Sequence, residues 1–209
     1  MAKLEIGANA MIYPNPIVLV GAQVDGRPDY CLVGDCAVAG VRWPLVMISL
    51  HEDHWTTRGV LKERAFSVNI PSIDLLDRVD ACGHLSGREV DKSSLFTTFY
   101  GELRTVPLIA ECPVVLECRV VGEILHEKRH VFLGEVAQAH VEERFLVGPP
   151  GKRVIAGLGE LDPILYGADD RYYRVGEPVA ASGTPGVKLV AALRVRPGGL
   201  ADPAQREGS

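Results

Sequence analysis

His51-Glu52-Asp53-His54 is the first cluster in the chain whose side chains could do chemistry. Two histidines bind zinc in the HExxH motif of metalloproteases, where they lie four residues apart on one face of a helix. Here the two histidines are three residues apart, at the expected junction of a strand and a helix, and no third ligand follows nearby. The cluster therefore does not predict a metal site.

A second polar cluster covers residues 86–92 and consists of Ser-Gly-Arg-Glu-Val-Asp-Lys. The hydroxyl of Ser86, the flexible glycine and the cations of Arg88 and Lys92 are groups that suit a phosphate. A solvated surface loop is the alternative interpretation, because charged loops are common on protein surfaces.

Hydroxyl groups close to the two histidines indicate a further place for an anion. Ser49 lies near the end of an expected strand, and Thr56 and Thr57 lie near the start of an expected helix. A helix N-terminus presents free amides and the positive end of its dipole, both of which favour a phosphate. In the alternative interpretation, the two threonines only cap the first turn and Ser49 lies inside the sheet.

The elements that must position these clusters begin with a hairpin. Residues 17–24 and 30–33 are β-branched or apolar, and Asp25-Gly26 between them supplies the positive φ angles of a tight turn. Residues 45–50 form a short continuous apolar run, which indicates a buried strand.

Two helices are expected next. Asp53 is expected to cap a helix over residues 55–64, which is followed by a strand over residues 66–70. Ser72 is expected to cap a second, amphipathic helix. Its apolar face would consist of Leu75, Leu76, Val79 and Cys82.

Sheet dominates the second half of the sequence. Residues 114–121 alternate, so that Leu116, Cys118 and Val120 are expected to face the core while Glu117 and Arg119 face outward. The charged tip at residues 127–129 leads into a further β-rich segment over residues 130–141, which predicts a long antiparallel hairpin. Because strands outnumber helices without regular βαβ alternation, we expect a mainly β (α+β) fold, an antiparallel barrel with a few inserted helices.

Composition excludes several classes of protein. The 209 residues are 47% hydrophobic, which is enough for one domain with a full core. The net charge of −5 and the lack of a dense Lys/Arg run argue against a nucleic-acid partner. The longest apolar stretch near the N-terminus, residues 17–22, is too short for a membrane span, and no basic segment leads into an apolar signal core. We therefore expect a cytoplasmic protein without a membrane partner.

Cysteine spacing and the composition of the C-terminal end complete the expected organisation. The five cysteines are an odd number at unrelated spacings, which predicts reduced thiols. Residues 1–176 are expected to form the domain. Residues 177–209 are expected to form an extension with one apolar patch at 187–193 and no stable structure over residues 195–209.

Taken in order, segments within about residues 13–176 resemble the flavoredoxin branch of the flavin reductase-like proteins. Residues 83–92 are similar to the family's G-x-x-S-G-R-x-x-D-K, its most specific element, and residues 66–71 are close to its F-x-V-N-x-P strand. The other similar segments are residues 14–20, 44–50, 107–113, 116–118 and 172–176.

The resemblance implies an antiparallel, Greek-key-like split β-barrel that binds FMN non-covalently between the two chains of a homodimer. It also implies a flavin oxidoreductase that takes electrons from NAD(P)H and passes them to an unknown acceptor. No catalytic acid or base is required, because the cofactors carry out the hydride transfer.

The resemblance also assigns roles to single residues. Ser49, His51 and Thr56 or Thr57 would lie near the phosphate and ribityl chain, and Lys92 would supply a cation. The full set of implied cofactor-binding residues is Asp29, Cys31, Leu32, Val33, Cys36, Ser49, Leu50, His51, Thr56, Thr57, Ser86, Arg88 and Lys92.

The segment after the first hairpin departs from the family's P-N-x-M-T-x-x-W, which contacts the flavin ring. Asp29 stands in place of the asparagine and Leu32 in place of the threonine. A carboxylate near the ring would disfavour an anionic reduced flavin. Two alternatives therefore remain beside the oxidoreductase: a flavoredoxin-like electron carrier without its own NAD(P)H site, and a non-enzymatic relative that has lost the flavin.

Overall fold

The computed structural model describes residues 1–194 of the chain. The chain divides into two units, of which the first is Met1–Val175 and the second begins at Gly176. The expected lack of structure over residues 195–209 lies outside the described residues.

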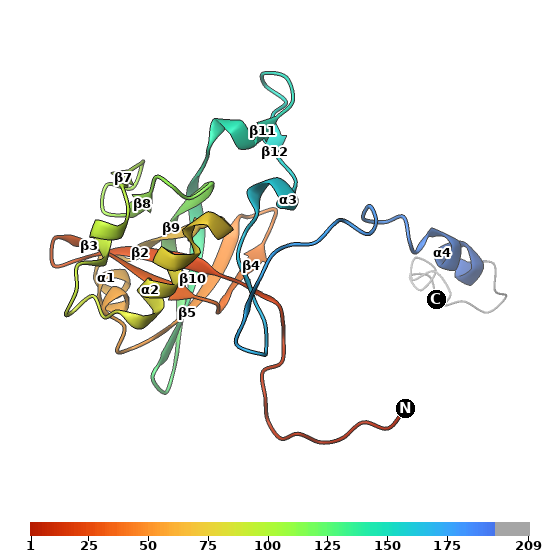
Figure 1. Cartoon of the computed structure of the whole chain (residues 1–209), viewed down its shortest axis with the longest axis horizontal. Coiled ribbons are helices and arrows are strands. Elements are labelled where there is room, and N and C mark those ends of the chain that lie inside the picture. The colour runs from red at the N-terminus through yellow and green to blue at the C-terminus, as the bar shows by residue number, and fades with distance from the viewer. Residues whose placement is uncertain (195–209) are drawn as a thin grey trace, which may run out of the picture. The chain divides into compact units, whose positions relative to one another are not determined.

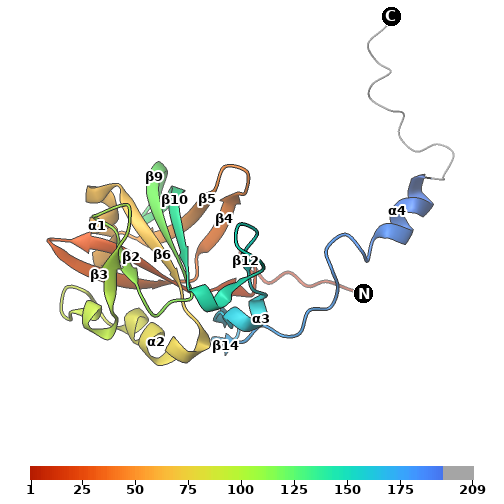
Figure 2. The ribbon, with the colours of Figure 1, turned by 90° about the horizontal axis from the view of Figure 1, so that it is seen from above.

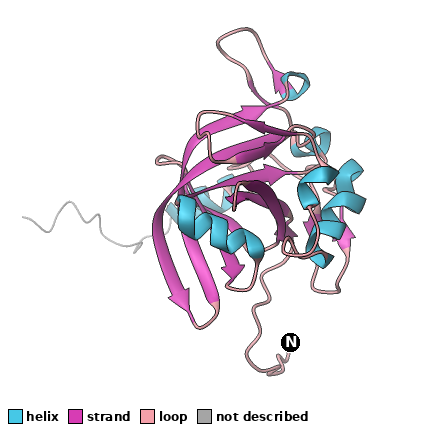
Figure 3. Cartoon of the chain, turned by 90° about the vertical axis from the view of Figure 1, so that its left-hand side faces the viewer, coloured by secondary structure: helices cyan, strands magenta, loops and turns pink. Residues whose placement is uncertain are grey.

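A seven-stranded antiparallel sheet in the order β3-β2-β6-β9-β10-β5-β4 forms the first unit (Figure 1). Although β3 and β4 end this order on opposite sides, only Gly34 and Asp35 separate them in the chain, so the sheet must curl until its two edges approach each other (Figure 3). The result is a barrel that is not closed, which confirms the expected mainly β fold with a few helices. The strands are β2 (Val18–Val24), β3 (Arg27–Val33), β4 (Cys36–Gly40), β5 (Leu45–His51), β6 (Ala65–Ile70), β9 (Val114–His126) and β10 (Arg129–Val141).

Short strands and helices surround this sheet. The additional strands are β1 (Asn15–Pro16), β7 (Thr98–Tyr100), β8 (Pro107–Ile109), β11 (Leu146–Val147), β12 (Val154–Ile155), β13 (Leu165–Tyr166) and β14 (Tyr172–Tyr173). The helices are α1 (Trp55–Glu63), α2 (Leu76–His84) and α3 (Leu158–Leu161), with 3₁₀ turns η1 (Ile73–Leu75), η2 (Lys92–Leu95) and η3 (Glu143–Phe145).

The first hairpin forms as its turn residues predict. Val24 of β2 pairs with Arg27 of β3, and the two residues between them, Asp25 and Gly26, have φ angles of 49° and 82°. These positive angles match the right-handed twist of the strands and are tolerated by aspartate and glycine. The long hairpin of β9 and β10 and the strand β5 are likewise confirmed.

Both expected helix caps are wrong. The residue before α1 is His54, so Asp53 lies one position too early to reach the first amides, and its carboxylate lies 3.5 Å from the ring of His51 instead. Ser72 precedes the turn η1 and also makes no side-chain cap; the amide of Leu75, which such a cap could bond, donates to the backbone carbonyl of Ser72 at 3.0 Å instead.

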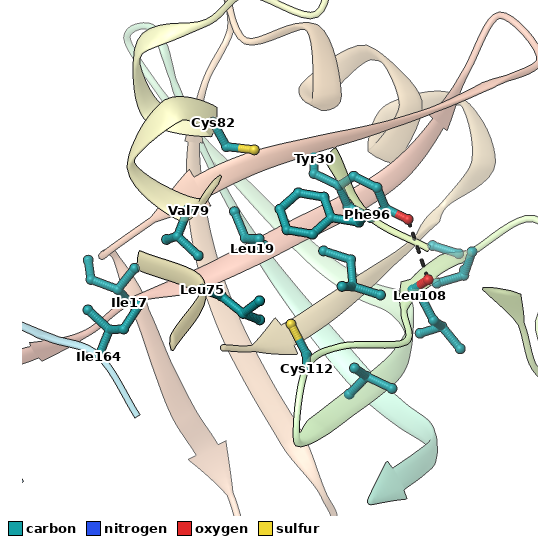
Figure 4. Close-up of a cluster of buried hydrophobic side chains, with 14 residues drawn as sticks. Ile17, Leu19, Tyr30, Leu75, Val79, Cys82, Phe96, Leu108, Cys112 and Ile164 are labelled. Atoms are coloured by element: carbon teal, nitrogen blue, oxygen red, sulfur yellow. Dashed lines mark hydrogen bonds between the residues drawn. The ribbon is translucent and has the colours of Figure 1, made fainter. Parts of the chain in front are cut away.

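The core lies on both faces of the sheet, which explains why β2 is apolar throughout. Val18 and Val20 point into the barrel, where Val60 of α1 also packs. Leu19 points to the other face, which α2 covers (Figure 2). Figure 4 shows this second cluster, in which Leu75 of η1 and Val79 and Cys82 of α2 pack with Leu19, Tyr30 and Phe96.

Glu117 overturns the expectation that it faces outward, because its side chain is completely buried. Its carboxylate accepts hydrogen bonds from the amides of Glu102, at 3.0 Å, and Leu103, at 2.5 Å. It also lies 2.6 Å from Nε2 of His140 on the neighbouring strand. These partners compensate for the burial of a charged group that the alternating pattern assigns to solvent.

The second unit contains α4 (Val187–Arg194) on the apolar patch expected at residues 187–193. Across residues 1–194, the helices are all too short or too polar to cross a membrane.

Candidate functional site

Four segments meet at a cleft of about 280 Å³. They are the end of β3, the start of α1, the end of α2, and the loop that joins α2 to η2. The lining residues are Cys31, Leu32, Asp53, His54, Trp55, Thr56, Cys82, Gly83, His84, Leu85, Ser86, Gly87 and Lys92.

A buried ion pair lies at the base of the cleft. Nζ of Lys92 is 3.3 Å from Oδ1 of Asp29, and the two side chains are only 4% and 2% exposed. The hydroxyl of Thr56 donates to the other carboxylate oxygen of Asp29 at 2.5 Å. The ion pair and the Thr56 hydrogen bond therefore connect η2, β3 and α1. The charges of Lys92 and Asp29 compensate each other.

Gly87 brings the 86–92 loop against this pair. A Cβ atom at this position would overlap the carboxylate of Asp29 and lie 2.7 Å from the ring of Trp55, closer than packed atoms come. The glycine is therefore required by the close approach of the loop and not only by flexibility. Arg27 fixes the same loop by donating to the carbonyl of Gly87 at 2.6 Å.

The start of α1 is electropositive. The helix has no side-chain cap; the amide of Thr57 donates to the carbonyl of His54 at 3.1 Å, which leaves the amides of Trp55 and Thr56 for another acceptor. Burial and the nearby charges of His51, Arg129 and Lys92 lower the pKa of His54, the residue before the helix. A site where cations and a helix N-terminus converge on a half-buried imidazole favours binding of an anion.

The thiols in the cleft wall are packing groups. Sγ of Cys31 lies 3.5 Å from Nδ1 of His54. Burial raises the pKa of Cys31 and of Cys82 to about 11 in each case. Both groups are therefore neutral near pH 7, when a nucleophilic cysteine would need to be a thiolate.

Trp55 carries an unused hydrogen-bond donor. Its Nε1 is buried and has no hydrogen-bond partner within residues 1–194. A buried donor without an acceptor costs about 1–3 kcal/mol, which a bound ligand or water can recover.

The structure brings together only part of the set implied by the sequence. Cys31, Leu32, Thr56, Ser86 and Lys92 line the cleft. His51 lies beside it, with its ring centroid 6.1 Å from that of His54.

The remaining residues of the set lie outside the cleft lining. Asp29 lies beneath the wall, and Thr57 is buried and donates to the carbonyl of His51 at 2.8 Å. Arg88 is exposed at the rim, with its guanidinium 5.8 Å from the Trp55 ring. Val33 and Leu50 belong to the barrel core, Cys36 packs against that core, and Oγ of Ser49 lies 3.5 Å from Arg129.

Sequence reasoning misses several residues of the site. The sequence suggests only a zinc-ligand role for His54, and Arg129 sits in a hairpin tip that looks like an ordinary charged turn. Arg129 lies opposite His51 because β10 pairs with β5. This pairing joins segments that are far apart in the sequence. The lining residues outside the implied cofactor-binding set are Asp53, Trp55, Cys82, Gly83, His84, Leu85 and Gly87, together with His54.

The curled antiparallel sheet forms an open split β-barrel, and the cleft beside it favours an anion. A profile described as "Flavin reductase like domain" matches residues 10–173. The chain belongs to this family.

Solved structures of similar proteins support the assignment. The flavoredoxin from Methanosarcina acetivorans is 36% identical, with a TM-score of 0.84 over 90% of this chain and 100% of that one. The flavoredoxin of Desulfovibrio vulgaris (Miyazaki F) is 28% identical, with a TM-score of 0.79 over 88% of this chain and 100% of that one. An FMN-binding protein from Thermus thermophilus with bound p-hydroxybenzaldehyde is 25% identical, with a TM-score of 0.70 over 87% of this chain and 97% of that one.

Curated relatives match over shorter lengths. The matches span 55% of an uncharacterized protein from Archaeoglobus fulgidus, at 35% identity over 45% of this chain, and 57% of one from Aeropyrum pernix, at 26% identity over 68% of this chain.

Proposed function

We propose that this chain is an FMN-binding oxidoreductase that takes a hydride from NAD(P)H. The observation that carries the proposal is the electropositive, uncapped start of α1 at the cleft. The family assignment and the similarity to an FMN-binding protein support the same cofactor class.

The residues present fit the phosphate of FMN. The free amides of α1, the hydroxyl of Thr56 and the imidazole of His54 line one end of the cleft. His51 lies beside His54, and Arg129, which pairs with Asp35 at 2.9 Å, is near enough to lower the pKa of His54. Hydrogen-bond donors of this kind bind a phosphate more strongly than charge alone. Lys92 contributes through its buried pair with Asp29, which shapes this wall.

The wall around the rest of the cleft fits a flat, mostly apolar ring. Leu32, Cys31, Cys82 and Leu85 supply apolar surface, and Trp55 supplies a buried N–H donor without a partner among the described residues. When bound, FMN supplies the hydride chemistry, while these residues orient the ring and exclude water.

We infer that a second copy completes the site. A cleft of about 280 Å³ is at the lower limit for a small-molecule site, so one chain encloses only part of a nucleotide. Large apolar side chains are also uncovered along the sheet edge and the long hairpin: Val38, Trp43 and Ile124 are 70%, 73% and 67% exposed. A homodimer that covers such surface would supply the missing wall.

The visible spectrum of the purified protein tests the proposal. We expect a yellow protein, or one that becomes yellow with added FMN, and bleaching after anaerobic mixing with NADH or NADPH. A colourless protein that does not take up FMN would refute the proposal. Light scattering should give the mass of two chains, and a monomer that binds FMN tightly would refute the inferred dimer.

Single substitutions of arginine test where the phosphate of FMN binds. Arg129→Gln should weaken FMN binding by about 1–3 kcal/mol, the value of a charged hydrogen bond, whereas Arg153→Gln should not. Arg153 is a matched control because it is exposed and pairs with Glu143 at 3.1 Å. Equal affinities in both variants would remove Arg129 from the site.

An electron carrier is the second candidate, because two similar structures are flavoredoxins. A carrier would bind FMN but stay oxidised with excess NADH and NADPH in a stopped-flow experiment. The third candidate is a relative that has lost the flavin. The argument for it was that the carboxylate of Asp29 would disfavour an anionic reduced flavin, but Lys92 compensates this charge. Full FMN occupancy in a crystal would exclude it.

A further inference from the structure

Three guanidinium groups gather on the Trp55 side of the cleft. Arg58 of α1 lies over the Trp55 ring, 4.2 Å from its centroid, and Arg88 of the 86–92 loop lies 5.8 Å from the same centroid. Arg27 of β3 donates to Gly87 at 2.6 Å. Three separate segments therefore bring positive charge to one wall.

Little of this charge is held in close ion pairs. Within residues 1–194, neither Arg27 nor Arg88 has a carboxylate at ion-pair distance, although Arg27 lies near enough to Asp91 to lower its pKa. Arg58 pairs only with Asp25, at 3.5 Å, and both side chains are about half exposed (51% and 57%), so this pair contributes little.

Two carboxylates lie on the same loop. Glu89 is exposed and follows Arg88 directly, and the guanidinium of Arg27 contributes to lowering the pKa of Asp91. Asp91 accepts from the amide and hydroxyl of Ser93 at 3.1 and 2.6 Å, which holds the turn η2. In a chain with 27 acidic and only 22 basic residues, three arginines are gathered at this one wall.

The arrangement favours phosphate over other anions. A guanidinium presents a planar fork that matches two phosphate oxygens, and contact with an aromatic ring restricts its orientation before binding. The three arginines lie outside the cleft lining, but they contact Trp55 and Gly87, which belong to it. A phosphate held by these arginines would therefore lie at the rim of the cleft.

We propose that Arg58 and Arg88 bind a phosphate of the nucleotide that donates the hydride. Arg27 is a positioning residue, because its contact with Gly87 holds the loop that carries Arg88. The inference rests on the proposed function and assigns the second substrate to the Trp55 side, while the FMN phosphate occupies the side of His54 and Arg129.

The test compares the holoprotein with the variants Arg58→Gln, Arg88→Gln and the double variant, with Arg153→Gln as the control. FMN affinity is measured by fluorescence titration, and NADH and NADPH affinities from the concentration dependence of anaerobic flavin reduction. In the double variant we expect nucleotide dissociation constants to rise by about 10- to 100-fold, as for lost charged hydrogen bonds, with FMN affinity unchanged. An equal rise of the dissociation constants for NADH and NADPH would mean that the arginines bind the pyrophosphate that both nucleotides share. A rise for NADPH alone would mean that they bind its 2′-phosphate.

Two results overturn the inference: unchanged nucleotide affinities in the double variant, or a loss of FMN affinity as large as the loss for the nucleotides. A wild-type protein that binds no FMN contradicts the proposed function instead. Calorimetric titration with NADP⁺ and NAD⁺ then tests the arginines directly: binding that the double variant weakens supports the inference, and no binding refutes it.

Discussion

Replacement of Lys92 by methionine should destabilise the protein strongly, because it leaves the carboxylate of Asp29 buried without its cation. The atoms of the pair are 3.3 Å apart in side chains that are 4% and 2% exposed. At an effective dielectric constant of about 20, their attraction is about 5 kcal/mol. Breaking a buried pair on one side typically costs about 3–5 kcal/mol, a large share of a domain stability of about 5–15 kcal/mol.

Urea unfolding of the flavin-free protein, followed by circular dichroism, measures this loss. The double variant Asp29→Asn/Lys92→Met should recover most of it, because no charge then remains buried and the introduced amide oxygen would still accept from Thr56. A loss below about 1 kcal/mol in Lys92→Met would refute the reasoning, as would a double variant that loses the sum of the two single changes.

Three further predictions concern the loop, the buried carboxylate and the thiols. Gly87→Ala should lower stability by about 1–3 kcal/mol in thermal unfolding, because its Cβ would overlap Asp29 and Trp55. Gly83→Ala is the control and should not lower stability, because its Cβ would meet Leu32 at 3.4 Å. Similar melting temperatures for the two variants would contradict the overlap. Burial alone would raise the pKa of Glu117, but hydrogen bonds from His140 and two amides hold it below the ordinary 4.5. The ionised Glu117 therefore stabilises the folded protein above pH 4.5, and this stabilisation is lost as the pH falls through the lowered pKa. Below about pH 4.5, the melting temperature of the wild type should fall more steeply with pH than that of Glu117→Gln. Parallel curves of melting temperature against pH would disprove the prediction. Because burial raises the pKa of Cys31 and Cys82 to about 11, iodoacetamide should label both slowly at pH 8 until denaturant is added, and rapid native labelling would show that the wall is open.

Local signals in the sequence predicted much of the sheet. Asp25-Gly26 defines its turn through the backbone angles that these two residues tolerate. The run at residues 45–50 is a strand, but only its alternate residues Val46, Ile48 and Leu50 are buried in the barrel core. The failures at Asp53 and Ser72 are positional: a cap must stand at one residue, and a one-residue offset or a competing backbone acceptor removes it.

Long-range pairing limits what the sequence reveals about the site. Glu117 is buried because His140 and the 101–103 turn meet it, and alternation along one strand does not contain that information. Asp29 and Lys92 lie far apart in the chain, so the sequence does not show that their charges compensate each other. Arg129 comes to lie opposite His51 only through the register of β10 with β5. The residue types of the loop were recognised, but not which of their charges were already paired.

The position of β9 and β10 in the sheet also affects the chain during synthesis. They are inserted between β6 and β5, although both of those strands precede them in sequence. A nascent chain therefore exposes two apolar strand edges until residue 141 has left the ribosome. At about 5–20 residues per second, the interval from residue 70 to 141 is on the order of 4–14 s, long enough for the chain to need chaperones or to aggregate.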